Sequence, residues 1–342
     1  MTAAVSPVQT EDAAVGYRMD TSRITALPLA SRNVVSLVTL GPGAIPRQLG
    51  GFVHDVNNDV QEGSRGSVAL NPPINGGRST MNAFLLDGAY DTDRNTFAIA
   101  VYPPMDSVRE FHIQSSLAPA EFPQAGGGAI DVVTKTGTKA LHGSAFEYLR
   151  NEATDAHNYF DNPSLPRPIF RQNEFGASLG GPVPRLKNTF FYGIYEGLRQ
   201  KSGTSGLSIV PDAATRGGDF GQTAIFDPLG HAPFPGNRIP QNRIDPIATA
   251  FLTKFEPLPN SAGATSNYRD ATPNEAPSNS ASGRIDHQFA NGSLLTGRYT
   301  FNGESNRVAG SFPLLPFSEQ VRAQQAAIAH TASAGHWLNE AP

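Results

Sequence analysis

The chain has 342 residues with 34 glycines, 28 prolines and only 16% charged side chains, a composition rich in turns and poor in helix. Its 26 Lys and Arg against 30 Asp and Glu give a net charge of −4, so no electrostatic case exists for nucleic-acid binding. The absence of cysteine excludes disulfide frameworks, zinc–thiolate sites and thiol catalysis. The sequence contains no run of about 18 apolar residues, so no transmembrane helix is predicted. Residues 1–20 lack the basic start and apolar stretch of a signal peptide.

The first 140 residues are predicted to form a compact α+β domain. Residues 24–40 have the pattern of a short helix, with Thr21 or Ser22 as its N-cap and a Gly-Pro-Gly stop at 41–43. Apolar and β-branched runs predict strands, and one segment starts as helix and continues as strand. The strands are expected at 67–70, 83–87 and 129–135, and the mixed segment at 107–114.

Short and long connections alternate through residues 141–338. Six strands are predicted, at 142–150, 173–181, 189–199, 282–290, 293–302 and 326–338. A short turn at 182–188 and the dipeptide Asn291-Gly292, a type I′ hairpin signal, connect two of the pairs. The other connections are long and irregular, at 151–172, 200–280 and 303–325. Transmembrane β-barrels have short periplasmic turns on one rim and long extracellular loops on the other.

Side chains within these strands alternate between an apolar and a polar set. Leu295, Tyr299 and Phe301 lie on the face opposite Arg298 and Thr300. Apolar residues outward and polar residues inward are what lipid outside and water inside a barrel require. The strand at 189–199 places four apolar residues on one face: Phe190, Tyr192, Ile194 and Leu198. Glu196 lies on the same face and is the exception to its apolar character. A half-buried antiparallel sheet of a soluble protein has the same alternation, so the pattern leaves both possibilities open.

Four motifs follow one another in a characteristic order before residue 140. They are Asn75-Gly76-Gly77-Arg78, FLLDG at 84–88, MDSVREF at 105–111 and AGGGAIDVVTK at 125–135. In this order and spacing they resemble the plug domain of TonB-dependent outer-membrane receptors. The segments at 141–160, 174–181 and 189–200 are similar to the Oar-like subgroup of these receptors, which is associated with carbohydrates and peptides.

The resemblance implies three parts: an N-terminal junction segment at 1–23, a plug domain at 24–140, and the N-terminal part of a β-barrel with long extracellular loops at 141–342. The expected fold class is an α+β plug domain followed by antiparallel transmembrane β-barrel strands. The barrel is expected to be incomplete and the chain a fragment, because such receptors close about 22 strands. By resemblance, the plug signature comprises Arg78, Asp87, Gly88, Glu110, Gly126, Gly127 and Gly128.

The function implied by the resemblance is energy-coupled uptake through a plugged barrel in the outer membrane. The expected partners are the TonB–ExbB–ExbD complex, outer-membrane lipid and an unidentified extracellular substrate, for which carbohydrates and peptides are the candidate classes. The loops at 151–172 and 200–280 are expected to contact the substrate. No covalent chemistry, cofactor or metal is expected. The alternative is a soluble or surface β-rich binding module of the adhesin type, whose long loops would bind a glycan.

A third hypothesis is a hydrolase, because residues 176–180 match the G-x-S-x-G nucleophile elbow with Ser178 at its centre. The elbow requires a sharp strand–turn–helix, whereas this motif lies inside an alternating strand. Asp91, Asp93 and Asn95 have the spacing of the first calcium ligands, but Thr96 replaces the required glycine, which favours a polar turn.

Glycines and arginines supply the remaining candidates. The glycine run at 126–128 leads into a strand rather than a helix, which favours close backbone packing over a phosphate cradle. Arg78, Arg150 and Arg199 fit either a solvated surface or a polar interface between plug and barrel.

Overall fold

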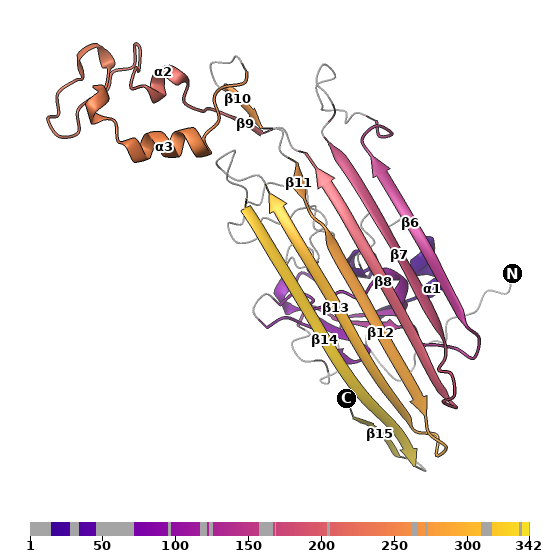
Figure 1. Ribbon diagram of the computed structural model, residues 1–342. Coiled ribbons are helices and arrows are strands. Elements are labelled where there is room, and N and C mark those ends of the chain that lie inside the picture. The colour runs from indigo at the N-terminus through magenta and orange to yellow at the C-terminus, as the bar shows by residue number, and fades with distance from the viewer. Residues whose placement is uncertain are drawn as a thin grey trace.

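The computed structural model describes residues 15–27, 34–45, 72–94, 97–116, 122, 126–156, 167, 169–203, 206–261, 266–270, 273–308, 317–334 and 337–341. It contains an N-terminal domain with a five-stranded sheet, a long eight-stranded sheet and an arm that projects from one end of the long sheet (Figure 1). The strand predicted at 67–70 lies outside these residues. Within them, no helix has the length and apolar character needed to span a membrane.

The N-terminal domain, residues 15–134, is built on the sheet order β1-β4-β5-β2-β3. Its strands are β1 Val15–Asp20, β2 Ala83–Leu86, β3 Ala89–Tyr90, β4 Val108–Ser116 and β5 Ala129–Thr134. β2 and β5 are parallel, and the other pairs are antiparallel. The strands predicted near 83, 107 and 129 are confirmed. β1 lies in the range expected to be a junction segment, and it pairs with β4 at the edge of the sheet.

The single helix predicted at 24–40 is wrong. The structure has α1 Thr21–Ala26 and a separate 3-10 helix, η1 Val34–Leu40. Asp20, rather than Thr21 or Ser22, is the N-cap of α1, because its Oδ1 accepts from the backbone N–H of Arg23 at 3.0 Å. α1 ends because Leu27 precedes a proline and is therefore held in the extended conformation.

Two further single-turn helices, η3 Ser79–Met81 and η4 Met105–Ser107, precede β2 and β4. Of the segment predicted to start as helix at 107, only Ser107 belongs to η4, and residues from Val108 on are strand. The apolar core is formed by the sheet together with residues of α1, η1 and η4. Its largest fully buried side chains include Met19, Leu37, Ile74, Phe84, Leu86, Phe111, Ile113 and Ile130. Burial of each such side chain contributes about 1.5–3 kcal/mol, which gives the domain a core of its own.

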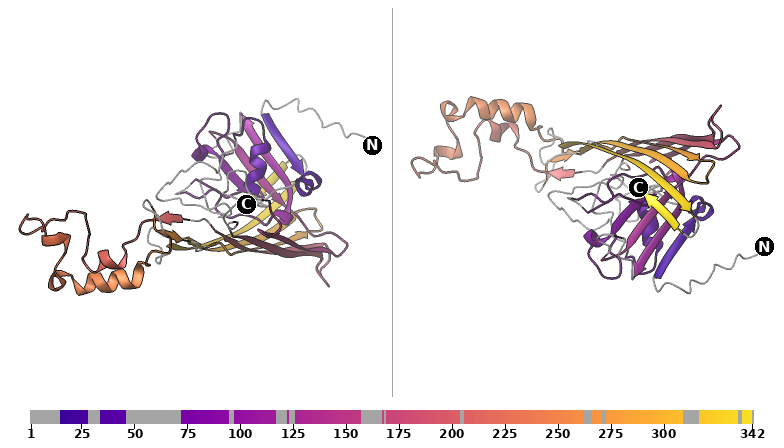
Figure 2. Two further views of the ribbon diagram at one scale, coloured as in Figure 1. Left: turned by 90° about the horizontal axis from the view of Figure 1, so that it is seen from above. Right: turned by 90° about the horizontal axis from the view of Figure 1, so that it is seen from below.

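The eight-stranded sheet is antiparallel throughout, and its six long strands are those expected from the sequence. They are β6 His142–Asn151, β7 Phe170–Pro182, β8 Thr189–Ser202, β12 Ser278–Gln288, β13 Leu294–Val308 and β14 Phe317–Ala334. The short strand β11 Asn274–Glu275 lies between β8 and β13, and β15 Trp337–Ala341 pairs with β14. Several strands extend beyond their predicted ends, so the long connections at 151–172 and 303–325 are shorter than expected. Figure 2 shows that the N-terminal domain lies against one face of this sheet.

The turn between β12 and β13 differs from the predicted type I′. A type I′ turn needs positive φ at both central residues, but only Gly292 has it, at 86°. The N–H of Phe289 donates to the carbonyl of Ser293 at 2.9 Å, which closes a three-residue loop. The Oδ1 atom of Asn291 accepts from the Ser293 N–H at 3.0 Å, and this Asx turn stabilises the longer loop.

The connection predicted to be irregular at 200–280 contains regular elements. They are β9 Gly206–Ser208, α2 Ala213–Arg216, η5 Pro235–Asn237, η6 Gln241–Arg243, α3 Pro246–Phe255 and β10 Tyr268–Asp270. Most of them form the arm in Figure 1. The carboxylates of Asp212 and Asp245 cap α2 and α3, accepting from the N–H of Thr215 at 2.8 Å and of Ile247 at 2.7 Å. An Asp cap followed by proline, as at 245–246, is a helix signal that the prediction missed.

Candidate functional site

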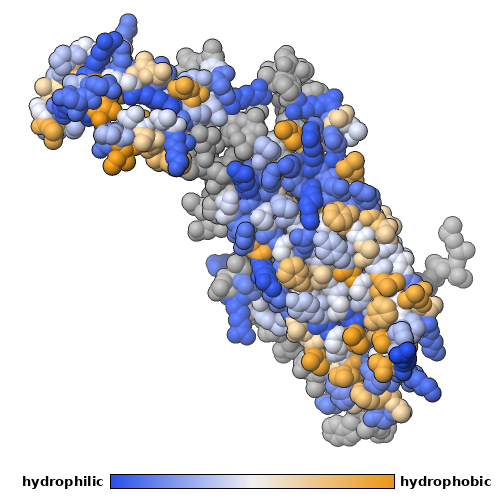
Figure 3. Space-filling view, viewed as in Figure 1, coloured by the Kyte–Doolittle hydropathy of each residue, from blue (hydrophilic) through white to orange (hydrophobic). Residues whose placement is uncertain are grey.

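In the long sheet the polar face is buried and the apolar face is exposed, which is the reverse of a sheet in a soluble protein. On the face towards the N-terminal domain, polar Thr300 and Glu196 are only 0% and 1% exposed. On the outward face, apolar Ile285 and Ile328 are 55% and 71% exposed. Figure 3 shows this outward face, with apolar side chains gathered over the half of the sheet near the short turns. A sheet in a soluble protein buries its apolar face instead. The burial therefore indicates a sheet whose outward face lies in lipid.

The expected assignment of faces is confirmed in β13, but β8 needs a correction. Its apolar residues Tyr192, Ile194 and Leu198 share one face as predicted, yet that face is the buried inner one. The register explains this, because Ile194 pairs with Ser282, which lies on the inner face of β12. The hydroxyl of Tyr192 donates to the carbonyl of Asp106 in the N-terminal domain at 2.9 Å. Apolar side chains here pack under the domain instead of facing lipid.

Asp87 is the centre of the contact between the domain and the sheet. It follows β2 in a two-residue turn, with φ values of 52° at Asp87 and 75° at Gly88. Positive φ at both positions defines a type I′ turn, for which Asp-Gly is a preferred pair. The backbone N–H and hydroxyl of Thr134 each donate to the Asp87 carboxylate at 2.7 Å. These two bonds fix the carboxylate at the edge of the domain that faces the sheet.

Two arginines of the sheet meet this carboxylate. Nη1 of Arg284 lies 3.0 Å from Oδ1 of Asp87, and Nε of Arg298 lies 2.9 Å from Oδ2. Arg284 is also paired with Asp286 at 3.0 Å. The side chain of Arg298 is only 1% exposed. A buried guanidinium without a carboxylate partner is strongly unfavourable, so Asp87 stabilises both the arginine and the seated domain.

Arg298 and Gln325 extend this network along the interface. Arg298 donates to the carbonyl of Leu86 at 3.0 Å and to Oε1 of Gln325 at 2.6 Å. Gln325 in turn donates to the carbonyl of Tyr90 at 3.1 Å and to Oδ1 of Asp91 at 3.2 Å. The end of β2 and the end of β3 are therefore held by side chains from β13 and β14.

A second contact uses amide groups only. The N–H of Tyr102 donates to Oδ1 of Asn302 at 2.7 Å, and the Asn302 amide donates to the carbonyl of Tyr102 at 2.8 Å. The same amide donates to the hydroxyl of Ser280 at 3.0 Å. The carboxamide thus pairs with the backbone as a neighbouring strand would. Like the ion pairs, this contact is polar, so water can replace it when the domain leaves the sheet.

Two further carboxyl groups lie beside Asp87. Burial raises the pKa of Asp91 well above its usual range, although the positive charge of Arg298 acts in the opposite direction. Burial also raises the pKa of Asp131, and the neighbouring Asp87 charge adds to this effect. The domain therefore holds two carboxyl groups near Asp87 and Arg298 whose pKa values are raised by burial.

The plug signature is only partly gathered at this interface, where Asp87 and Gly88 lie. Glu110 lies on β4, paired with Arg18 at 2.6 Å and in contact with His112 at 3.1 Å. Arg78 is exposed at the start of η3.

The signature glycines Gly126, Gly127 and Gly128 pack against the backbone around η3. The N–H of Gly127 donates to the carbonyl of Met81 at 2.9 Å, and the carbonyl of Gly128 accepts from Ala83 at 2.9 Å. A Cβ atom on Gly128 would stand 2.7 Å from Cδ1 of Ile74 and 3.1 Å from the carbonyl oxygen of Gln114. Close backbone packing is therefore the role of this run, as the sequence favoured.

The other candidate residues have local roles. Arg150 stacks over the ring of Phe170 at 4.6 Å and Arg199 over Phe175 at 5.5 Å, so neither forms the interface with the domain. Ser178 lies in the middle of β7, with its hydroxyl 2.9 Å from that of Ser144, and not at a nucleophile elbow. Asp91 of the calcium-like spacing accepts from the N–H of Val101 at 3.2 Å. Within the described ranges, no group of three or more His, Cys, Asp or Glu could hold a metal ion.

Sequence reasoning missed the residues of the sheet that complete the site: Arg284, Arg298, Asn302 and Gln325. Arg298 stood on the polar face that was predicted for the strand at 293–302. The available signal was an arginine in the middle of an alternating strand, because a charge at that depth needs a partner inside the protein.

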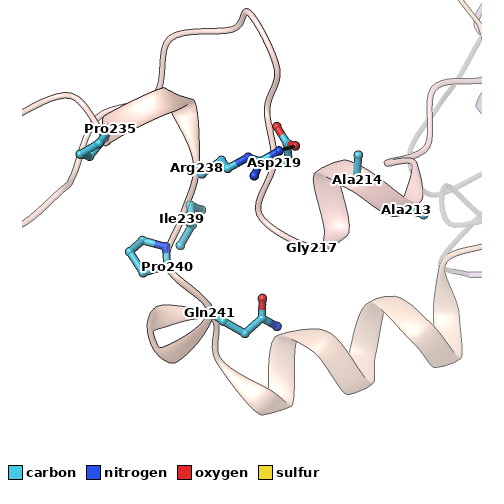
Figure 4. Close-up of a pocket in the computed structure, with 9 residues that line it drawn as sticks. All are labelled: Ala213, Ala214, Gly217, Asp219, Pro235, Arg238, Ile239, Pro240 and Gln241. Carbon is cyan, nitrogen blue, oxygen red and sulfur yellow. Dashed lines mark hydrogen bonds and ion pairs between the residues drawn. The ribbon is translucent and has the colours of Figure 1, made fainter.

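The arm carries a cleft of ≈ 580 Å³. In Figure 4, Arg238 and Asp219 lie side by side as an ion pair, with Gln241 below them. Apolar residues complete the lining: Ala213, Ala214, Pro235, Ile239 and Pro240. Polar and apolar groups line this open cleft in similar proportion, so it offers hydrogen-bonding groups beside apolar contacts.

Known proteins share this fold and part of this sequence. Residues 133–341 match the family model described as outer membrane beta barrel domain, so the chain belongs to that family. It is 29% identical over 136 residues to the TonB-dependent transporter Oar of Myxococcus xanthus, a match that covers 35% of this chain and 12% of that protein. The outer membrane transporter YddB of Escherichia coli has a similar fold, with a TM-score of 0.59 and 12% identity over 94% of this chain and 37% of that one.

A ferric enterobactin receptor, PfeA of Pseudomonas aeruginosa, is similar in fold as well, with a TM-score of 0.56 and 13% identity over 96% of this chain and 40% of that one. The chain thus spans 12% of its curated relative and 37% to 40% of these solved structures. It is an outer-membrane β-barrel protein related to a TonB-dependent transporter. The named relatives are transporters and receptors. The outward face of the sheet is accordingly the face in contact with lipid.

Proposed function

We propose that this chain supplies the plug and part of the wall of a receptor that imports an extracellular substrate with energy from TonB–ExbB–ExbD. The N-terminal domain, from β1 at residue 15 to about residue 140, acts as the plug, so part of the expected junction at 1–23 belongs to it, and residues 141–342 act as wall. The observation that carries the proposal is the polar attachment of the N-terminal domain to the inner face of the sheet through Asp87. The family of the chain and its Oar relative support the same reading.

The polar contacts of the interface suit a plug that must move. The ion pairs at Asp87 and the amide hydrogen bonds at Asn302 are contacts that water can satisfy after the plug leaves. An apolar interface would expose its whole surface to water on each opening and would oppose movement. The plug keeps its own apolar core, so its fold does not depend on the wall. A binding module that never opens has no need to combine an apolar core inside one domain with a polar contact between that domain and the sheet.

The substrate is a carbohydrate or a peptide contacted by the long connections at 151–172 and 200–280. The cleft of ≈ 580 Å³ in the arm supports this, since it lies in the second of these connections and offers the Asp219–Arg238 pair beside an apolar wall. No covalent step is required of the protein. Its work is to bind the substrate and to open a path.

A removable crosslink tests the opening step. The chain has no cysteine, so the pair Tyr102→Cys and Asn302→Cys introduces the only thiols and joins the plug to the wall where the two residues contact each other. Uptake is first identified as growth on glycans or peptides that is lost on deletion of the gene and on deletion of tonB. Oxidation of the double variant is expected to stop that uptake, and reduction is expected to restore it.

The matched control joins two wall strands. Ser144→Cys and Ser178→Cys replace hydroxyls that lie 2.9 Å apart on β6 and β7, so their disulfide leaves the plug free. Uptake is expected to continue in this variant after oxidation. Continued uptake with the plug crosslinked, or uptake that does not need TonB, would contradict the proposed function.

A further inference from the structure

The outward face of the sheet carries aromatic residues at two levels. Near the short turns, Phe289 lies between His287 and His330, with ring centroids 4.6 Å and 6.4 Å away. Near the arm, Phe175 and Tyr195 lie with centroids 6.4 Å apart. Aromatic girdles of this kind mark the two boundaries of the hydrocarbon layer on membrane barrels. Between them the exposed side chains include apolar Leu179, Ile285 and Ile328, with Tyr299 among them.

Basic side chains stand at and above the girdle near the arm. Arg199, Arg307 and Arg322 are exposed, and their pairing in the sheet puts them on the outward face. Among the described residues, none of the three has a carboxylate within ion-pair distance, whereas Lys201 in the same region is paired with Glu275 at 2.7 Å. Three positive charges are therefore not compensated at this level of the lipid-facing surface.

Neutral groups hold two of these arginines in place. Arg199 lies over the ring of Phe175 at 5.5 Å and donates to the carbonyls of Leu198 and Ser278 and to Oδ1 of Asn279, at 2.8 to 2.9 Å. Arg322 lies over the ring of Phe301 at 5.7 Å. Ring faces and amide oxygens orient a guanidinium without cancelling its charge, so both remain available to an anion.

The height of this band fits the headgroup level of a membrane. β8 runs from Thr189, which pairs with His287 of the lower girdle, to Arg199. These residues span about 33 Å along the strand at roughly 3.3 Å per residue. With a tilt of about 40°, that is about 25 Å of height, which equals the apolar band of outer-membrane barrels. Arg199 therefore stands where lipid headgroups begin.

A groove for an apolar chain lies below the arginines on the same face. Cβ atoms placed on Gly193, Gly283 and Gly297 would meet nothing within 4 Å, so three neighbouring strands leave open space there. The groove measures ≈ 520 Å³, and Phe191, Ile285, Tyr299 and Ile328 are among the residues that line it. It lies about 15 Å below Arg199 in height, by the same rise and tilt, which is about half the thickness of the hydrocarbon core.

We propose that Arg199, Arg307 and Arg322 bind the phosphate-bearing headgroup of a membrane lipid whose acyl chain occupies the groove at Gly283. Arginine suits phosphate because its planar fork of donors matches the phosphate oxygens. The cations and the groove are independent features, and together they select a lipid that is anionic at one end and apolar at the other. The inference depends on the membrane location of the sheet and not on the proposed uptake.

Native mass spectrometry of the full-length protein in detergent tests this site. Diphosphoryl lipid A is the probe, and its dephosphorylated form and phosphatidylcholine are the comparisons. The triple change Arg199→Gln, Arg307→Gln and Arg322→Gln is expected to weaken binding of the diphosphoryl lipid roughly 100-fold, from about fivefold for each basic side chain at a charged membrane surface. The corresponding Arg→Lys triple variant keeps the charges and is expected to retain most of the binding.

Two controls separate the lipid from simpler explanations. Arg150→Gln removes one positive charge from β6 on the inner face, and it is expected to leave binding unchanged. Gly283→Leu fills the groove and is expected to weaken binding of the lipid while the arginines remain. Equal binding of the phosphorylated and dephosphorylated lipids would overturn the proposal. So would unchanged binding in the Arg→Gln triple variant, or full displacement of the lipid by inorganic phosphate at equal concentration.

Discussion

Asp87 and Glu110 are both acids of the plug signature, and both are paired with arginine, but their surroundings differ. Asp87 faces Arg298, whose side chain is 1% exposed, whereas Glu110 faces Arg18, whose side chain is 64% exposed. Water compensates an exposed charge that loses its partner, and it cannot reach a buried one. The same substitution at the two positions is therefore informative about the interface.

The change Asp87→Asn is expected to destabilise the seating of the N-terminal domain by about 3–5 kcal/mol, because it leaves the buried Arg298 without its carboxylate partner, while Arg284 keeps Asp286. The isosteric change Glu110→Gln is expected to cost less than about 1 kcal/mol. Both costs are measured by titrating the full-length protein in detergent with urea and detecting release of the domain by its cleavage with a protease. Equal costs at the two positions would show that Asp87 does not hold the domain.

Asp91 gives the interface a pH dependence. Burial raises its pKa in the seated domain, so the seated state is expected to bind more protons than a released state in which water reaches Asp91. The stability that protonation of Asp91 contributes is therefore full below the ordinary pKa of about 3.9 and is lost as pH rises towards the raised value.

The change Asp91→Asn is expected to stabilise the seated domain at neutral pH, because the amide has no charge to bury. Its Oδ1 can still accept from Val101 and Gln325, as the carboxylate does at 3.2 Å. The stabilisation is expected to shrink as the pH falls towards about 4. The urea midpoint at a series of pH values checks this, and a gain that is constant with pH would assign the effect to something other than Asp91 ionisation.

At the scale of single elements, the turn between β12 and β13 depends on one backbone conformation. Gly292 has φ 86°, where a Cβ atom costs about 1–2 kcal/mol. Gly292→Ala is expected to lower the stability of the long sheet by about that amount. Gly283→Ala is the control, since its φ is not positive and nothing stands within 4 Å of the added atom. Thermal unfolding of both variants in detergent makes the comparison, and an equal loss in both would count against the turn geometry.

The strands could be predicted from sequence because a period of two in polarity survives in each long strand. Their ends could not, because β13 and β14 continue to Val308 and from Phe317 by pairing with each other rather than by local pattern. The burial of the apolar face of β8 was missed for a similar reason, since only the docked domain decides which face is inner. In the arm, the caps of α2 and α3 were local signals and could have been read.

The site was only half visible in the sequence. Asp87-Gly88 could be found as a turn motif, but Arg284 and Arg298 lie far from it in the chain. Arg284 is 197 positions from Asp87, and Arg298 is 212 positions from the Leu86 carbonyl that it binds. Contacts at such separations leave no local periodicity, so the partners of a motif residue become visible only in the folded chain.

At the scale of the whole molecule, the N-terminal domain is expected to fold without the sheet. Residues 15–139 contain all five strands of its sheet and its described core, so this segment is expected to be soluble and monomeric with dispersed amide NMR signals. Residues 24–139 lack β1 and the buried Met19, and they are expected to be less stable by several kcal/mol. Aggregation of the longer segment would show that the domain needs the sheet to fold.

The order of strands in this domain has a mechanical consequence. β1 lies at one edge of the sheet, and the residues bound to the wall follow β2 and β3 at the other edge. A force applied at the N-terminal end therefore loads the β1–β4 pair first and reaches the Asp87 contacts last. Optical-tweezer traces of the full-length protein are expected to show β1 detaching while the anchored edge stays in place. The domain would then lengthen in small steps, and each step would need less force than tearing the whole plug from the wall at once.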